Sequence, residues 1–226
     1  DGCSREVKPV ATPNIWDTCS QKCSMYSVLI PTLSGNSMNT KIQQVCISDL
    51  WNWLETVVDP EIPVLTILDM GIVRRIEIRD NGQLTISDLE GRTNANVPVN
   101  PENARLLVFV TPTYTGCPAM NMIGAHIRLE LAAHGFSDVT VREVLQPAWT
   151  TEWIPESARQ KLREYGIAPP EQEARFERLL FSDVAVTCPR CQSRNTEKLA
   201  EYGSTACKAL YRCKDCLEPF DYFKCH

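Results

Sequence analysis

The chain has 226 residues, of which 43% are hydrophobic and 23% charged, and its formal net charge is −5. This balance suits a folded protein with a buried core and disfavours wholesale disorder. The negative charge argues against a protein that binds nucleic acid by general attraction to phosphate. The longest apolar run in the middle of the chain, residues 106–110, is far shorter than the roughly 20 residues of a membrane helix. We therefore expect no nucleic-acid partner and no membrane partner.

Eleven cysteines are the unusual feature of the composition, and they are segregated along the chain. Four lie before residue 47, one stands alone at position 117, and six lie between positions 188 and 225. An odd total fits poorly with a fully paired disulfide framework. Residues 1–37 show no basic start followed by an apolar core, as a secretory signal would. We therefore expect a cytoplasmic protein, in whose reducing surroundings closely spaced cysteines bind metal or do redox chemistry.

Residues 1–37 have no sustained hydrophobic period and are predicted to be a poorly ordered extension, whereas residues 38–150 predict one small domain. Within this domain, Asp80-Asn81-Gly82 indicates a β-hairpin. The predicted elements are, in chain order, a helix over 40–58 ended by Pro60, strands over 72–78 and 83–87, a surface insertion over 88–104, a strand over 105–111, a helix from Pro118 capped by Gly135, and a strand over 139–145. This order predicts an α/β (α+β) sandwich with a mixed sheet and two main helices.

The last third of the chain predicts a helical linker followed by a second small domain. Residues 151–183 contain a predicted helix over 155–165, which Gly166 stops, and then Pro-Pro and a charged run. Residues 184–226 contain two Cys-x-x-Cys turns separated by 21 residues, with a hairpin and a third strand predicted around the second turn. Two such turns place four sulfurs about one ion. The segment is therefore predicted to be a zinc ribbon of short β-strands.

Four cysteines of this ribbon are the predicted ligands of a structural Zn²⁺, and rubredoxin-like iron is the main alternative because the same four sulfurs would accept it. The ligands are Cys188, Cys191, Cys213 and Cys216. A segment of about 40 residues has too little core to fold alone, so bound metal would supply much of its stability. Cys207 and Cys225 remain as secondary thiols. They are either packed within the ribbon or ligands of a transient cluster.

Cys117 is the one cysteine of the middle domain that its surroundings single out. It is predicted to occupy the N-cap of the helix that starts at Pro118, where the positive end of the helix dipole lowers the pKa of a thiol. Asp59 and Glu61 lie in a rigid Pro-containing turn and are expected to supply carboxylate oxygens nearby. These three residues form a candidate metal- or cluster-transfer site. The alternative is that Cys117 is a small buried residue at a turn.

Six segments in the same order carry a resemblance to a known family. They are DPEIPVLTI from Asp59, TPTYTGCPA from Thr111, PAWTTEW from Pro147, REYGIAPP from Arg163, GSTACKALYRC from Gly203 and EPFDYFKC from Glu218. From about residue 42 to its end, the chain resembles the PaaD family of phenylacetate-degradation proteins, which form the D (or J) subunit of the ring 1,2-phenylacetyl-CoA epoxidase. The middle domain also resembles the wider SufT-like family, which is linked to iron–sulfur protein assembly.

The resemblance implies an accessory subunit in aerobic catabolism of an aromatic compound, within a monooxygenase (epoxidase) complex. The redox chemistry of that complex lies on its oxygenase and reductase subunits, which are the expected partners, and no catalytic site of this chain's own is evident. By analogy with the family, the subunit assists iron or iron–sulfur cluster assembly and carries a transient iron or cluster. Cys117 matches the family's cysteine, Asp59 and Glu61 match its acidic turn, and the four paired cysteines match its ribbon. The alternative is a purely structural docking protein without a role in metal delivery.

Overall fold

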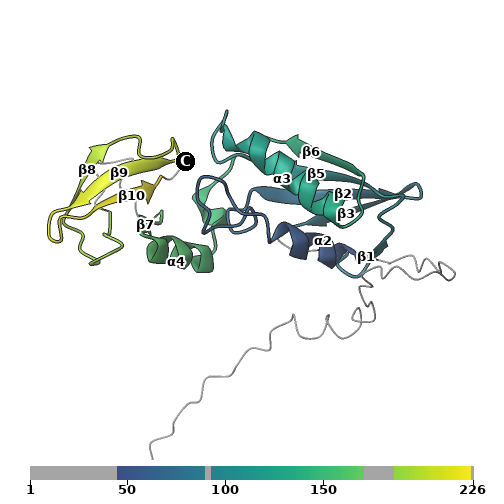
Figure 1. Ribbon diagram of the computed structural model, residues 1–226, viewed down its shortest axis with the longest axis horizontal. Coiled ribbons are helices and arrows are strands. Elements are labelled where there is room, and N and C mark those ends of the chain that lie inside the picture. Colours follow the sequence, from purple (N-terminus) through teal and green to yellow (C-terminus); the bar gives the residue numbers. More distant parts are fainter. Residues whose placement is uncertain (1–44, 90–92, 171–185, 225–226) are drawn as a thin grey trace, which may run out of the picture. The chain divides into compact units, whose positions relative to one another are not determined.

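The computed structural model describes residues 45–89, 93–170 and 186–224 (Figure 1). All of them belong to one of the two compact units of the chain, Gln44–His226. The extension predicted over 1–37 lies outside the described residues, as does Cys225. Within the described ranges, every helix is too short or too polar to cross a membrane.

A four-stranded mixed sheet forms the centre of the middle domain, in the order β3-β2-β5-β6. Its strands are β2 (Val73–Asp80), β3 (Gln83–Asp88), β5 (Arg105–Val110) and β6 (Asp138–Glu143). The β2–β3 and β2–β5 pairs are antiparallel, and β5–β6 is parallel. Asn81 and Gly82 both have positive φ, 49° and 81°, as the predicted hairpin turn requires. The mixed sheet and its two main helices confirm the predicted α/β class.

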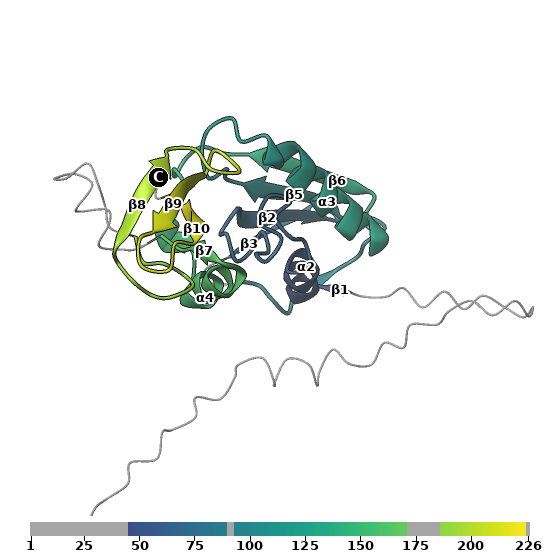
Figure 2. The same ribbon diagram turned by 60° about the vertical axis from the view of Figure 1, so that its left-hand side comes forward.

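Two helices, α2 (Ile47–Leu54) and α3 (Ala119–Ala133), pack beside each other against this sheet (Figures 1 and 2). The helix predicted over 40–58 is confirmed over residues 47–54, but its predicted bounds are too wide, because residues 45–46 form a strand and residues 55–58 are not helical. Its start is set by Asp49, whose carboxylate accepts the Cys46 backbone N–H at 2.8 Å. The residues before it form β1 (Val45–Cys46), which pairs with β4 (Pro98–Val99) inside the segment predicted as a surface insertion.

The domain core lies between these helices and the sheet. The largest side chains that are almost wholly buried there include Trp51, Ile47, Leu50, Leu54, Ile76 and Phe136. The Trp51 indole N–H donates to the Ser87 hydroxyl at 2.9 Å, which joins α2 to β3. Since both side chains are fully buried, this bond satisfies polar groups that water cannot reach.

The segment predicted as a helical linker contains a helix and also contributes a strand to the ribbon sheet. It contains a short 3₁₀ turn, η2 (Thr151–Trp153), and α4 (Glu156–Tyr165), which ends at Gly166 with φ of 93° as predicted. It then forms β7 (Ile167–Ala168), which pairs in parallel with a strand of the ribbon. The ribbon sheet therefore has four strands rather than three, in the order β7-β10-β9-β8, with β8 (Thr196–Ala200), β9 (Lys208–Cys213) and β10 (Pro219–Phe223).

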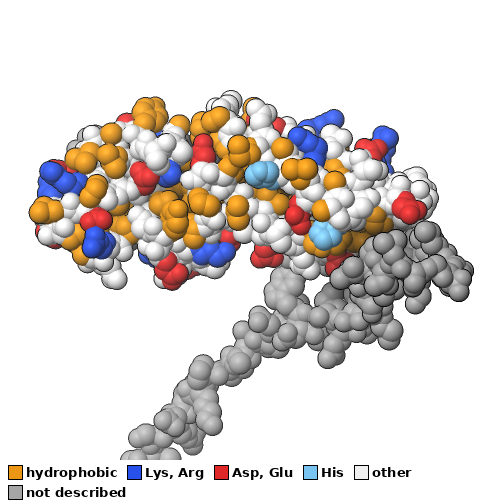
Figure 3. Space-filling view, in the orientation of Figure 1, with side chains coloured by type: hydrophobic (Ala, Val, Ile, Leu, Met, Phe, Trp, Pro, Cys, Tyr) orange, Lys and Arg blue, Asp and Glu red, His pale blue; other side chains and the backbone are white. Residues whose placement is uncertain are grey.

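The core of the middle domain extends to residues of the ribbon. Cys207 and Phe223 are buried in the same hydrophobic cluster as the helices and strands of that domain. The Trp149 ring contacts the Phe223 ring edge-on, with centroids 6.0 Å apart, and its indole N–H donates to the Met70 carbonyl at 2.8 Å. On the face drawn in Figure 3, acidic and basic side chains are interspersed among hydrophobic ones. The hydrophobic core that the middle domain shares with Cys207 and Phe223 of the ribbon is what positions the candidate site.

Candidate metal centres

The four paired cysteines of the ribbon converge on one point. Their sulfur atoms all lie within 4.8 Å of one another, and no other set of three or more metal-ligating groups in the described ranges meets that condition. The Cys188 and Cys216 sulfurs are 3.8 Å apart, and the Cys191 and Cys213 sulfurs are 3.5 Å apart. Sulfurs bound tetrahedrally to one zinc ion at 2.3 Å would be about 3.8 Å apart. The residues present therefore fit a metal ion.

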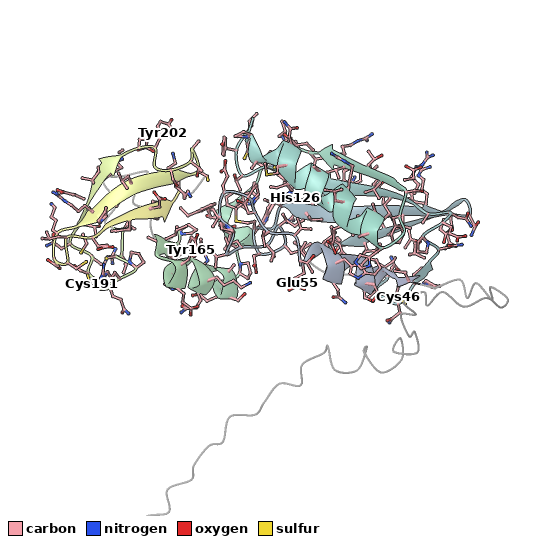
Figure 4. The ribbon with its side chains drawn as sticks, viewed as in Figure 1. Cys46, Glu55, His126, Tyr165, Cys191 and Tyr202 are labelled. Atoms are coloured by element: carbon pink, nitrogen blue, oxygen red, sulfur yellow. The ribbon has the colours of Figure 1, made fainter. Side chains whose placement is uncertain are left out.

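Backbone N–H groups act to lower the thiol pKa of Cys191, Cys213 and Cys216, although the neighbouring thiols and desolvation leave the pKa of Cys191 and of Cys216 raised in the metal-free protein. The Cys216 N–H approaches the Cys213 sulfur at 3.5 Å and is the largest cause that lowers the pKa of the Cys213 thiol to about 7. The first turn is closed by the Gln192 N–H, which donates to the Cys188 carbonyl at 2.9 Å, with Gln192 at a φ of 63°. Figure 4 labels Cys191 in this turn. Because metal ligation needs deprotonated cysteines, these contacts prepare the site for a cation.

Cys117 lies in the loop between β5 and α3, one residue before the N-cap of α3 rather than at the N-cap as predicted. Pro118 occupies the N-cap of α3, and Cys117 precedes it. Gly116 has a φ of 82°, a conformation that glycine adopts without strain, and so lets the loop turn just before the cysteine. The Ala119 N–H and the Tyr114 hydroxyl favour the thiolate, but burial outweighs them and raises the pKa of Cys117. The predicted lowering of this pKa is therefore wrong in direction.

The predicted acidic turn lies beside Cys117. Asp59 is buried, and one of its carboxylate oxygens accepts the N–H groups of Glu61 and Ile62, each at 2.8 Å. Burial raises the pKa of the Asp59 carboxyl, and the two N–H groups oppose that rise. The charges of Glu61 and of Asp59 both raise the pKa of Cys117. The structure therefore places the three residues that the sequence proposed as a transfer site close enough for their charges to interact, although their ligand atoms do not all lie within 4.8 Å of one another.

The ribbon adds a second thiol to this site. The Cys207 sulfur, in the turn before β9, lies 3.8 Å from a carboxylate oxygen of Glu61. Burial raises the pKa of Cys207 to about 11, and the Glu61 charge contributes to the rise. We call Asp59, Glu61, Tyr114, Cys117, Cys207 and Lys208 the junction cluster, because they come from the middle domain and the ribbon.

Two members of the junction cluster were missed by sequence reasoning. The Tyr114 hydroxyl contacts the Cys117 sulfur, and burial raises the pKa of that phenol. The Lys208 ammonium is buried, lies 3.7 Å from a carboxylate oxygen of Asp221 and donates to the Glu61 carbonyl at 3.5 Å. Both residues stand inside segments that carry the family resemblance, TPTYTGCPA and GSTACKALYRC, which was the available signal.

The comparisons with known proteins agree with the ribbon and decide the family. The family model described as the PaaD zinc beta ribbon domain matches residues 172–224. A curated protein of Escherichia coli (strain K12), named as the putative D subunit of 1,2-phenylacetyl-CoA epoxidase, is 42% identical over 179 residues, 79% of this chain and 93% of that protein. This chain belongs to the PaaD family. The family resemblance found in the sequence is thereby confirmed.

One further curated protein and two solved structures are similar to this chain over about half of its length. A Fe-S protein maturation auxiliary factor of Porphyromonas gingivalis (strain ATCC BAA-308 / W83) is 24% identical over 115 residues, 50% of this PaaD-family chain and 88% of that protein. A solved domain of unknown function, DUF59 from Bacillus anthracis, has 22% identity and a TM-score of 0.37, with 50% of this chain and 88% of that chain covered. Rv1466 from Mycobacterium tuberculosis, a protein associated with [Fe-S] complex assembly and repair, has 23% identity and a TM-score of 0.29, with 58% and 96% covered.

Proposed function

We propose that this protein is the accessory D subunit of a 1,2-phenylacetyl-CoA epoxidase and assists iron or iron–sulfur cluster assembly in that complex. The observation that carries the proposal is the proximity of Cys117 to Glu61 and Asp59, whose charges raise the pKa of its thiol, in a chain of the PaaD family. Thiolate and carboxylate are ligands that iron accepts. Similarity to a named Fe-S protein maturation auxiliary factor supports the same role.

In this proposal the iron or cluster is cargo, and the protein's own residues bind it and pass it on. Cys117 supplies the thiolate that takes up the metal, and its proton leaves when the bond forms. Glu61 and Asp59 supply carboxylate charge beside it, while the Tyr114 hydroxyl orients the sulfur. The raised pKa of Cys117 keeps the thiol protonated until a cation arrives. The oxygenase and reductase subunits are the partners, in a reducing cytoplasm that keeps these thiols available.

The test is iron loading of the client. The oxygenase and reductase subunits are co-expressed with the wild-type chain, with Cys117→Ser or with no chain, and the iron content of the purified complex is measured. We expect Cys117→Ser to give the low iron content found without the chain. Cys46→Ser is the matched control, since Cys46 lies at the start of α2 outside the junction cluster and serine is a good N-cap. Full iron content with Cys117→Ser would overturn the proposal in favour of a docking protein.

We further propose that the ribbon holds one structural Zn²⁺ through its four paired cysteines. The sulfur separations and the family model support this assignment. Protein purified without oxygen is expected to contain about one zinc per chain and to be colourless, as a four-cysteine zinc site is. Iron and visible colour that persist in Cys117→Ser would assign rubredoxin-like iron to the ribbon instead.

A further inference from the structure

Cys207 is a buried thiol of the ribbon that lies outside the four cysteines proposed to bind the ribbon metal. Its sulfur lies at the predicted transfer site, beside Glu61. We infer that Cys207 and Cys117, with Glu61 as their shared neighbour, form a second metal site that binds a thiophilic divalent transition-metal ion such as Fe²⁺. This inference rests on the proposed function and deepens it, because it gives the cargo two thiolates and a carboxylate from two parts of the chain.

The separation of Cys207 from Glu61 suits two ligands of one ion. Their sulfur and carboxylate oxygen are 3.8 Å apart. A sulfur at 2.3 Å and an oxygen at 2.1 Å from a tetrahedral ion would be about 3.6 Å apart. The two groups thus already stand at nearly the distance of a ligand edge. The three ligand atoms do not yet all lie within 4.8 Å of one another, so the Cys117 sulfur has to approach the other two. Cys117 is half-buried, in a loop that turns at Gly116 and in which Thr115, Gly116 and Pro118 are exposed.

The main chain holds this pair in place from both sides. The Lys208 N–H donates to the Thr205 carbonyl at 3.1 Å, and the Lys224 N–H donates to the Cys207 carbonyl at 2.9 Å. The Thr205 hydroxyl lies 3.0 Å from the Cys207 sulfur. On the other side, the Asp59 carboxylate fixes the Glu61 N–H. A preorganised pair of ligands loses little entropy when it binds an ion.

Burial and charge explain why a cation would bind here. Cys207 and Asp59 are buried, Cys117 and Glu61 are half-buried, and all four side chains can carry negative charge. A divalent ion among them would stabilise all the anions at once, and a coordinating thiol is deprotonated outright. The Lys208 ammonium offers less relief, since it also faces Asp221. The cluster therefore has an excess of potential anions over cationic charge.

Co²⁺ is a suitable probe, because its thiolate complexes absorb strongly and each thiolate adds to the charge-transfer band. The full chain is purified with zinc in the ribbon, and Co²⁺ is added without oxygen under reductant. Zinc is expected to stay in the ribbon because a site of soft thiolate ligands selects Zn²⁺. We expect a thiolate-to-cobalt band at one cobalt per chain, and about half its intensity in either Cys207→Ser or Cys117→Ser.

Two further variants sharpen this titration. Glu61→Gln keeps both thiols and is expected to weaken Co²⁺ binding about tenfold or more, since even an outer partner of a metal ligand is worth that much. Cys46→Ser is the matched control and should leave both the intensity and the affinity unchanged. A band in Cys207→Ser equal to that of the wild type would overturn the inference.

A measurement on the wild-type chain tests the inference even if the substituted proteins do not fold. X-ray absorption at the cobalt edge of the zinc-loaded protein sees only the added ion, and we expect two sulfur ligands beside oxygen. One sulfur would overturn the inference and leave the proposed function intact, provided that Cys117→Ser still fails to load the client. Two sulfurs together with full client loading by Cys117→Ser would keep the metal site and overturn the proposed function.

Discussion

At the scale of single residues, the chemistry of Cys117 depends on the balance between a helix end and its acidic neighbours. The Ala119 N–H, at the start of α3, favours the thiolate, and this is the contribution that the sequence predicted. Burial and the charges of Glu61 and Asp59 act in the opposite direction and prevail. The sequence places Glu61 more than 50 positions from Cys117, so the repulsion between them depends on tertiary structure alone.

Replacing Glu61 should make Cys117 more acidic. Glu61→Gln removes a negative charge beside the sulfur, so the pKa of Cys117 falls towards its ordinary value although burial still raises it. We expect the midpoint of the pH–rate profile for alkylation of Cys117 in the metal-free cluster to move to lower pH. The profile is followed by mass spectrometry of the peptide that contains Cys117.

The control for this experiment is Glu55→Gln. Glu55 is an exposed carboxylate at the end of α2 (Figure 4), and it is not among the groups that chiefly shift the pKa of Cys117. Its replacement should leave the midpoint where it is in the wild type. An unchanged or higher midpoint in Glu61→Gln would show that Glu61 does not disfavour the Cys117 thiolate.

At the scale of elements, Arg159 holds together the segment between the middle domain and the ribbon. Its side chain is buried and donates to the carbonyls of Thr151, Ile154 and Pro170, at the start of η2, before α4 and after β7. Arg159→Met keeps most of the apolar length of the side chain and removes the donor of the Ile154 and Pro170 carbonyls, whereas the Thr151 carbonyl still accepts the Ile154 N–H at 3.3 Å. Each buried polar group left unsatisfied costs about 1–3 kcal/mol.

We therefore expect Arg159→Met to lower the free energy of unfolding by about 1–3 kcal/mol or more in urea titration. Arg163→Met, one turn later on α4, is the control. The Arg163 side chain is 39% exposed and pairs with an exposed Glu156, a kind of ion pair worth at most about 1 kcal/mol. If Arg159→Met lowered the free energy of unfolding only as little as Arg163→Met does, the carbonyls that Arg159 serves would have found other donors.

The sequence predicted those elements whose pattern is continuous and local. The Asn81-Gly82 hairpin, the apolar strand β5 and the helix α4 ended by Gly166 all carry their own signals. The pairing of β1 with β4 could not be predicted, because it joins residues more than 50 positions apart. β7 was missed because two residues are too short for any hydrophobic period.

The candidate sites likewise include features that local sequence predicts and features that depend on contacts between distant parts of the chain. The spacing of the four ribbon cysteines already implied their convergence, because each Cys-x-x-Cys turn sets two sulfurs locally. Cys117 was singled out by the predicted helix start, and Asp59 and Glu61 by their Pro-containing turn, but the approach of these residues to one another depends on the fold. The contact between Cys207 and Glu61 spans 146 positions and has no counterpart in any spacing rule.

At the scale of the whole molecule, the ribbon and the middle domain depend on metal to different degrees. The middle domain has its own sheet, two helices and an extensive buried core. The ribbon's separate core is a small cluster that includes Cys188, Cys213, Tyr211 and Tyr222. A core of that size leaves a segment dependent on its bound metal.

Removal of the ribbon metal should therefore unfold the ribbon and leave the middle domain folded. We expect hydrogen exchange of the full chain, treated with a chelator, to show lost protection across β8, β9 and β10, with β2 and β5 still protected. Protection near Trp149 should fall partly, because its ring packs against Phe223 of β10. Cys213→Ser should give the same pattern without chelator, since it removes one of the four proposed ligands.

The matched control is Cys207→Ser, which removes a ribbon thiol outside the four-sulfur set. It should retain about one zinc per chain and full protection of the ribbon strands. If chelation exposed β2 and β5 together with the ribbon, the two parts would fold as one cooperative unit. The shared burial of Cys207 and Phe223 in the middle domain's core would then be what couples them.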